Sequence, residues 1–229
     1  MSRAPERRYA TPGSTPEPGE IWQPVGPKAT LFALYTIPID RAIPLLPRGI
    51  EPVRVWHGRT VGAVFLTYYG PGSTLEYHEL IVSPAYVRHA GRTGWWVSHI
   101  YVDNERSMAG GRALGLPKEM ADFAWEGNGP GRVTVKLGGQ ELATLAWSAP
   151  GRQWRVPISS YGISIKDRAV LRSKQTLSAK WGRCDLSVSM PEESPFRALP
   201  LEKPLITLCG HEMSGEMCVD LKTIGWVKG

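Results

Sequence analysis

Apolar and polar residues alternate along most of the chain from residue 30 onward, a period of two that is typical of β-strands buried on one face. The alternation predicts strands at residues 30–37, 53–57, 61–69, 75–87, 95–102, 118–125, 132–137, 141–147, 177–190 and 217–227. Glycine or proline punctuates most of the gaps between them. The compact turns that these residues form suit antiparallel neighbours.

Two segments carry helix signals instead. Residues 40–46 open with a plausible N-cap and are soon interrupted by prolines. Residues 104–114 carry the stronger signal, because Asp103 or Asn104 can cap the first turn and Gly115 stands where a helix commonly ends in a left-handed residue.

The number of strands predicts how they are arranged. An open sheet with so many strands would leave free edges, which favours a closed or nearly closed barrel. The expected fold class is therefore mainly β (α+β): one antiparallel, barrel-like domain over residues 28–229 with one or two short helices. Residues 1–27, rich in proline, glycine, serine and charge, are expected to form an extended arm, with the basic cluster of Arg3, Arg7 and Arg8 solvated.

Composition excludes several classes of protein. Hydrophobic residues make up 42% of the 229 positions, which is enough for a core and excludes a disordered, collagen-like or coiled-coil chain. The three cysteines are odd in number and show no CxxC spacing, which argues against a disulfide framework or a structural zinc site as the basis of the fold. The first twenty residues lack the apolar segment of a signal peptide, and no apolar run approaches the ~20 residues of a membrane span. We therefore expect a cytoplasmic protein with no membrane partner.

The net charge of +6 is compatible with a nucleic-acid partner. The basic residues are scattered, however, and the nine tryptophans lie in apolar or alternating runs that suit a core or a pocket wall. We expect no nucleic-acid partner. A non-enzymatic, salt-sensitive binding module stays the third hypothesis.

Residues 114–120 bring a lysine to the end of the second predicted helix. Lys118 follows a proline and is flanked by Leu116, Met120 and Phe123. If this lysine points inward, its ammonium group is desolvated, and desolvation favours the neutral amine. A neutral lysine can attack a ketone and form a Schiff base.

The surroundings of Lys118 resemble a known signature. Residues 101–105 (YVDNE), 111–112 (GR) and 115–118 (GLPK) are similar to the motif of the acetoacetate decarboxylase superfamily, and Tyr77-His78-Glu79 resembles its Tyr-x-Glu. Residues 45–47 and 49–52 match less specifically. The resemblance implies that Lys118 is the Schiff-base lysine and Glu79 the active-site glutamate. It also places the family's substrate-binding arginine near Lys28, although lysine lacks the arginine fork.

One position departs from the family pattern. Acetoacetate decarboxylase has a second lysine where this chain has Glu119, and an adjacent anion stabilises an ammonium where an adjacent cation would destabilise it. Consecutive residues of a strand face opposite ways, so Glu119 can point out of the pocket. Arg112 and Asn104 belong to the motif but are expected to hold helix ends and turns.

The leading hypothesis is a Schiff-base-forming lyase for a small oxo acid. It would be either a decarboxylase of a 3-oxo acid or a pyruvate-type aldolase-dehydratase, and it would need no metal or organic cofactor. Glu79 would position the substrate or move a proton, and Tyr68, Tyr77, Tyr101 and Met120 would line the pocket.

The alternative keeps the pocket and drops the covalent step: a cyclase or ligand-binding barrel for a polyketide-like molecule in natural-product metabolism. In either case the family resemblance implies a homo-oligomer.

Overall fold

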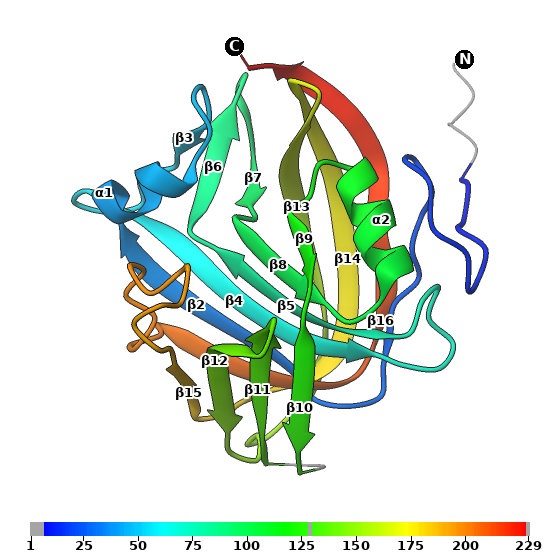
Figure 1. Ribbon diagram of the computed structural model, residues 1–229, viewed down its shortest axis with the longest axis vertical. Coiled ribbons are helices and arrows are strands. Elements are labelled where there is room, and N and C mark those ends of the chain that lie inside the picture. Colours follow the sequence, from blue (N-terminus) through cyan, green and yellow to red (C-terminus); the bar gives the residue numbers. More distant parts are fainter. Residues whose placement is uncertain (1–6, 128–129, 228–229) are drawn as a thin grey trace.

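The computed structural model describes residues 7–127 and 130–227, and strands make up most of them (Figure 1). The helical elements are α1 (Ile39–Ala42), the 3-10 turn η1 (Ile43–Leu45) and α2 (Glu105–Ala113). The strands are β1 (Val25–Gly26), β2 (Thr30–Pro38), β3 (Glu51–Pro52), β4 (Arg59–Tyr69), β5 (Tyr77–Ser83), β6 (Ala85–His89), β7 (Arg92–Trp96), β8 (His99–Val102), β9 (Lys118–Met120), β10 (Asp122–Glu126), β11 (Gly131–Leu137), β12 (Gln140–Trp147), β13 (Trp154–Lys166), β14 (Ala169–Arg183), β15 (Leu186–Ser189) and β16 (Ile206–Trp226). The mainly β fold with short helices is confirmed.

Twelve strands form the main sheet, in the order β3-β6-β7-β13-β14-β16-β2-β4-β5-β8-β9, with β1 paired to β16. Neighbours are antiparallel except β7 with β13 and β8 with β9, which are parallel. The long strand β16 curves from the upper right of Figure 1 round to its lower left. It can therefore pair with β14 along most of its length and with β2 at its start.

A second sheet of four strands, β10-β11-β12-β15, covers part of one face of the main sheet. Alternation along each strand decides which side chains fill the space between the sheets. On β5, Leu80 and Val82 enter this core, where they join Val133 and Leu145 of the small sheet. The intervening residues of β5 point to the opposite face of the main sheet, which is free to line a cavity.

Several expected strands are divided in the structure. Residues 75–87 become β5 and β6 because Pro84 interrupts the run, and residues 95–102 become β7 and β8. Residues 118–125 split at Ala121, where the chain passes from the main sheet (β9) to the small one (β10).

One strand prediction was wrong, and one long strand was not predicted. Residues 53–57 form an irregular connection rather than a strand, with Val55 N–H bonded across a tight turn to the carbonyl of Arg59. Conversely, β13 was missed. Trp154, Val156 and Ile158 do alternate with polar residues or proline, but Pro157 and Gly162 break up the run and its first half is exposed in the structure.

The helix at residues 104–114 is confirmed as α2. Asn104 is its N-cap, and its side-chain oxygen accepts hydrogen bonds from the N–H groups of Arg106 (2.9 Å) and Ser107 (3.0 Å). Gly115 follows the helix with φ +72°, and a Cβ there would collide with the carbonyl of Ile165. Both ends of α2 are thus fixed, and with them the entry of the chain into β9.

The segment before residue 28 contacts the main sheet over much of its length. Ile21 and Trp22 are buried, Trp22 exchanges backbone hydrogen bonds with Met217, and β1 pairs with β16. The sequence assigned these residues to an arm outside the domain; the structure packs their second half onto it. Arg7 and Arg8 are exposed and form ion pairs with glutamates, whereas Arg3 lies outside the described residues.

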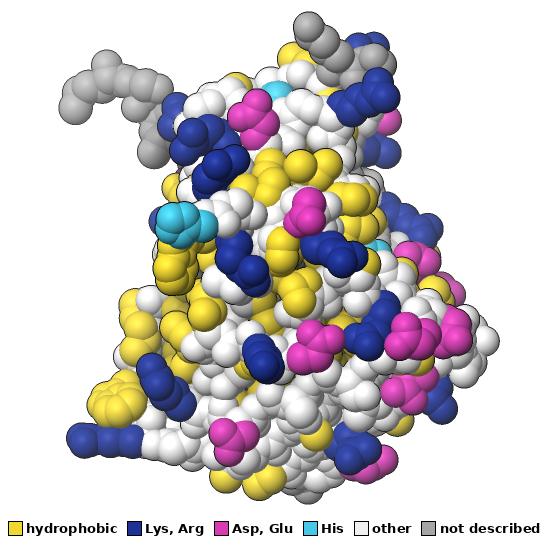
Figure 2. All heavy atoms as spheres, turned by 90° about the vertical axis from the view of Figure 1, so that its left-hand side faces the viewer, with side chains coloured by type: hydrophobic (Ala, Val, Ile, Leu, Met, Phe, Trp, Pro, Cys, Tyr) yellow, Lys and Arg dark blue, Asp and Glu magenta, His cyan; other side chains and the backbone are white. Residues whose placement is uncertain are grey.

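The surface is mixed in character. On the face that Figure 2 shows, lysine and arginine side chains are dispersed among acidic and apolar ones. No helix among the described residues has the length and apolar character that crossing a membrane requires.

Candidate active site

Lys118 is the first residue of β9 and points into the interior. Parallel pairing with Ile100 of β8 fixes its backbone, and only 3% of the residue is exposed. Its side chain passes directly over Gly111 of α2. A Cβ at position 111 would lie 2.6 Å from Cε of Lys118 and closer still to its Cδ. The glycine in the middle of this helix therefore makes room for the lysine.

Three kinds of contact hold the Lys118 amine. Its Nζ donates hydrogen bonds to Oε1 of Glu79 (2.8 Å) and to Oγ of Ser107 (2.9 Å). The same nitrogen lies over two aromatic rings, 5.1 Å from the centroid of Trp22 and 5.0 Å from that of Tyr77. The amine is thus fixed by one carboxylate, one hydroxyl and two π-faces, all contributed by other elements.

Glu79 completes the pair from β5. It is 3% exposed, and its second oxygen, Oε2, accepts a hydrogen bond from the hydroxyl of Tyr69 at 2.8 Å. Burial, reinforced by the charge of Glu79, raises the pKa of Tyr69 well above its usual value. The phenol therefore stays protonated and donates, and each oxygen of Glu79 has a donor.

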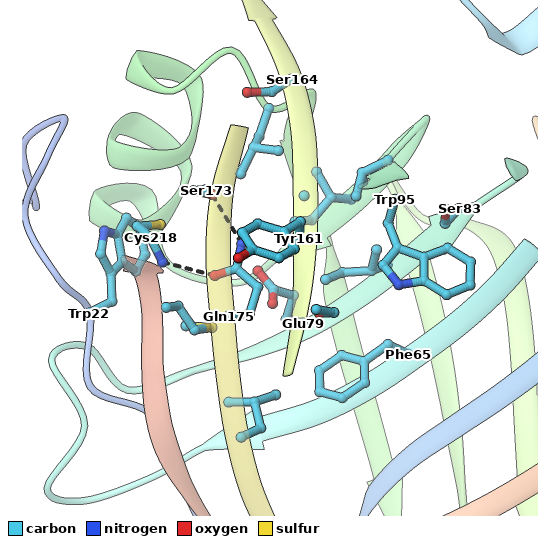
Figure 3. A pocket seen from close by; sticks show the side chains of 18 of the residues that line it. Trp22, Phe65, Glu79, Ser83, Trp95, Tyr161, Ser164, Ser173, Gln175 and Cys218 are labelled. Carbon is cyan, nitrogen blue, oxygen red and sulfur yellow. Dashed lines mark hydrogen bonds between the residues drawn. The ribbon is translucent and has the colours of Figure 1, made fainter. Parts of the chain in front are cut away.

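The ion pair lies at a cavity of about 420 Å³. Figure 3 shows side chains converging on it from several strands, with Trp22 and Cys218 toward one end, Trp95, Ser83 and Phe65 toward the other, and Glu79 between them. Apolar and aromatic groups dominate the walls. The main lining residues are Trp22, Phe32, Ala63, Phe65, Ile81, Trp95, Leu177 and Trp181, with Ser159, Ser160, Tyr161, Ser173 and Gln175 on the side of β13 and β14.

Gln175 orders one wall of the cavity. Its Oε1 accepts a hydrogen bond from the N–H of Cys218 (2.8 Å), and its Nε2 donates to Oγ of Ser173 (3.1 Å; Figure 3). Burial raises the pKa of Cys218 to about 12; the charge of Lys118 lowers it and that of Glu79 raises it. Cys218 therefore faces the site as a neutral thiol and not as a nucleophilic thiolate.

The structure brings together three of the residues predicted from the sequence: Lys118, Glu79 and Tyr77. Alternation also places their neighbours as expected. Glu119 is exposed, and His78 points to the other face of the sheet, where its Nδ1 lies 2.6 Å from Oδ2 of Asp103.

Four expected pocket residues do not line the cavity. Lys28 is exposed, and its Nζ lies 4.8 Å from the ring centroid of Tyr68. Tyr68 points away because it alternates with Tyr69 on β4. Tyr101 is buried in the core between the two sheets, and Met120 packs against the cluster around the cavity without reaching its surface.

Sequence reasoning missed Tyr69, Ser107 and Trp22. Tyr69 lies on the strand that pairs with β5, directly opposite Tyr77, so cross-strand pairing was the signal that could have found it. Ser107 stands four residues before Gly111 on the same helix face, which helical periodicity could have shown. Trp22 comes from the presumed arm and left no local signal.

Arg112, as expected, has a structural part: its Nε donates to the backbone carbonyl of Lys118 at 2.8 Å and fixes the start of β9. The described residues hold no cluster of three histidine, cysteine or acidic side chains that could bind a metal ion.

Comparisons with known proteins bear on the family and the fold of the chain. The sequence profile of the acetoacetate decarboxylase family matches residues 9–164. No curated protein sequence matches significantly. Among solved structures, an acetoacetate decarboxylase is similar with a TM-score of 0.65 at 15% identity, covering 95% of this chain and 96% of that one.

Two further structures give the same fold. The acetoacetate decarboxylase from Legionella pneumophila has a TM-score of 0.62 at 16% identity, covering 98% of this chain and 93% of that one. The enduracididine biosynthesis enzyme MppR, complexed with the condensation product of pyruvate and imidazole 4-carboxaldehyde, has a TM-score of 0.62 at 14% identity and covers 98% and 99%.

Proposed function

Because this chain belongs to the acetoacetate decarboxylase family, we propose that it is a lyase that forms a Schiff base between Lys118 and the carbonyl carbon of an oxo acid. The observation that carries the proposal is the buried Lys118 amine, 2.8 Å from the Glu79 carboxylate at the wall of a cavity. A lysine that served only to stabilise the fold would have no need of an adjoining space large enough for a substrate.

The pair supplies its own base. Transfer of one proton from the Lys118 ammonium to Glu79 yields a neutral amine and a carboxylic acid without changing the net charge of the buried site. The amine then adds to the substrate carbonyl, one amine proton passes to the carbonyl oxygen, and Glu79 returns its proton to the resulting hydroxyl group, which leaves as water. The product is an iminium on Nζ, and Tyr69 keeps Glu79 oriented throughout.

The iminium acts as an electron sink. In a 3-oxo acid, the bond between the carboxylate carbon and C2 breaks, CO2 leaves, and the electron pair flows into the iminium to give an enamine. In a pyruvate-type reaction, loss of a proton from C3 gives the enamine, which attacks an aldehyde before water is eliminated. The structure of MppR complexed with pyruvate supports considering the second route. In the decarboxylation route a proton adds to the enamine carbon and regenerates the iminium. In both routes water hydrolyses the iminium, which releases the product and restores Lys118.

Borohydride trapping tests the Schiff base directly. Borohydride should reduce the iminium to a secondary amine, so that incubation with candidate oxo acids leaves a mass adduct on the peptide containing Lys118. The Lys118→Met variant should lose the adduct completely. Lys28→Met, which removes an exposed lysine outside the cavity, should keep it. Absence of any adduct with a broad panel would contradict the proposal.

A second candidate function is non-covalent cyclisation of a polyketide-like molecule, and the aromatic lining of the cavity favours it. The same Lys118→Met variant separates the two. Retained turnover would favour the cyclase, whereas loss of turnover together with the adduct would favour the lyase. A homo-oligomeric state and a cytoplasmic location stay predictions.

A further inference from the structure

The cavity extends far beyond the ion pair. Alternate residues of β5 line it, from Glu79 through Ile81 to Ser83, and Ala63 of the neighbouring strand lies opposite Ser83. Glu79 and Ser83 are four positions apart, which is about 13 Å at ~3.3 Å per strand residue. A three-carbon or four-carbon oxo acid attached to Lys118 would leave the distant end empty.

The volume leads to the same conclusion. About 420 Å³ lies within the ~300–1,000 Å³ range of pockets that hold drug-sized ligands. The side chains beyond Glu79 are largely apolar and include Ile81. Phe65 and Trp95 surround the distant half (Figure 3). Such a wall favours the binding of apolar ligands, because it removes their surface from water.

The cavity offers no second cation for a carboxylate. Among the described residues that line it, Lys118 carries the sole positive charge, and Glu79 already neutralises it. The exposed Lys28 is outside the cavity. Arg172 is not among the lining residues either; its guanidinium lies 3.3 Å from the ring centroid of Tyr161, and its Nε is bonded to the carbonyl of Thr93. A small anionic acid therefore finds neither a matching charge nor a matching volume.

We infer that the physiological substrate is a carbonyl compound with an extended aryl or alkyl body, selected by that body and not by a carboxylate. This inference rests on the proposed Schiff base at Lys118, which fixes the reacting carbonyl at one end. The rest of the molecule then lies along β4 and β5 toward Ala63, Ser83 and Trp95. If the substrate is an oxo acid, it is one with a long apolar chain or ring.

Trapping with three carbonyl probes tests the inference on the unmodified protein. Acetone, pyruvate and 4-phenylbutan-2-one are each incubated with borohydride, and the concentration that labels half of Lys118 is measured by peptide mass spectrometry. Each value is divided by that for N-α-acetyl-lysine, which removes differences in intrinsic reactivity. We expect the phenyl ketone to label at a concentration at least tenfold lower than either small probe. Pyruvate or acetone labelling at an equal or lower concentration would overturn the inference.

Two single substitutions, one in the cavity and one outside it, test where the aryl or alkyl part of the substrate binds. Ala63→Leu should fill the distant end and raise the half-labelling concentration of the phenyl ketone severalfold more than that of acetone. Ala124→Leu makes the same change at an exposed position of β10, outside the cavity, and should leave both values as they are. Equal effects of Ala63→Leu on both ketones would count against the inference.

Failure of the Schiff base can be told apart from failure of the substrate class. If no probe labels Lys118, the proposed function fails. Quenching of tryptophan fluorescence then reports binding, since Trp22, Trp95 and Trp181 line the cavity. Tighter binding of the phenyl ketone than of acetone and pyruvate would uphold the ligand class by itself, and weaker or equal binding would overturn it.

Discussion

At the scale of residues, the central feature of the site is the buried ion pair between Lys118 and Glu79. Lys118 and Glu79 are each 3% exposed, so the loss of either leaves the other charge largely shielded from bulk water. Removing one member of such a pair is far more costly than the pair's net contribution to stability, because an uncompensated buried charge is left behind.

Glu79→Gln should therefore damage both stability and chemistry. We expect the free energy of unfolding to fall by ~3–5 kcal/mol, as for other broken buried pairs, and labelling or turnover to fall by ~10²–10⁴-fold with the loss of the proton carrier. Urea unfolding and trapping rates measure the two effects. In the double variant Lys118→Met/Glu79→Gln no charge remains, so its stability should exceed that of Glu79→Gln. A less stable double variant would show that the pair is not the source of the loss.

Tyr69 offers a second test at the same scale. Tyr69→Phe removes a hydrogen bond to a charged oxygen, which should lower the free energy of unfolding by ~1.5–3 kcal/mol and slow trapping by loosening Glu79. Tyr35→Phe is the matched control. The Tyr35 hydroxyl is also buried but has no hydrogen-bond partner among the described residues, so its removal should cost little. Equal losses in the two variants would contradict the role given to Tyr69.

At the scale of elements, α2 and β9 position the lysine together. The helix contributes Ser107 as a hydrogen-bond acceptor and Gly111 as the space through which the side chain passes. Its capped ends fix where β9 begins.

Gly111→Ala should consequently impair the site while strengthening the helix. Alanine is favoured over glycine in a helix by about 1 kcal/mol, yet its methyl group would displace the Lys118 side chain. We expect trapping to slow by at least tenfold with little loss of stability. Ala109→Gly, on the exposed side of α2, should lower the stability by about 1 kcal/mol and trap at the normal rate. Normal trapping by Gly111→Ala would show that the lysine does not need this space.

The sequence predicted elements well where local signals decide the structure. The caps of α2 are side-chain and glycine preferences, and the inward direction of Lys118 with the outward direction of Glu119 follows from strand alternation. The sequence-based predictions failed where contacts between distant segments determine the structure. β13 pairs with β14 although half of it is exposed, and Tyr69 and Trp22 reach the site through neighbouring strands rather than through nearby sequence. Tyr101 and Tyr68 were chosen by chain position alone, and both point to the wrong face of the main sheet.

At the scale of the whole molecule, the main sheet separates two environments. One face packs against the small sheet and forms the core, and the other lines the cavity. His99 of β8 lies on the core side, where its ring packs edge-on against Phe196 at 5.5 Å.

Burial of His99 should make the fold sensitive to acid. Burial lowers the pKa of His99 below its model-peptide value of 6.5. As the pH falls, the unfolded chain therefore takes up a proton at His99 at a higher pH than the folded chain does. The contribution of neutral His99 to the free energy of unfolding is fully present above pH 6.5 and is lost as the pH falls through the folded pKa. The free energy of unfolding should drop between pH 7 and pH 5, and His99→Gln should drop less. An identical drop in the variant would exclude His99 as a source.

The burial of Trp22 beside the reacting amine has a practical consequence. A shortened polypeptide that starts at residue 28 would keep most of the main sheet but open one side of the site to bulk solvent. Water would then compete for the amine and hydrolyse any imine before carbon–carbon chemistry was complete. Preparations trimmed at this position should be expected to fold yet to be poor catalysts.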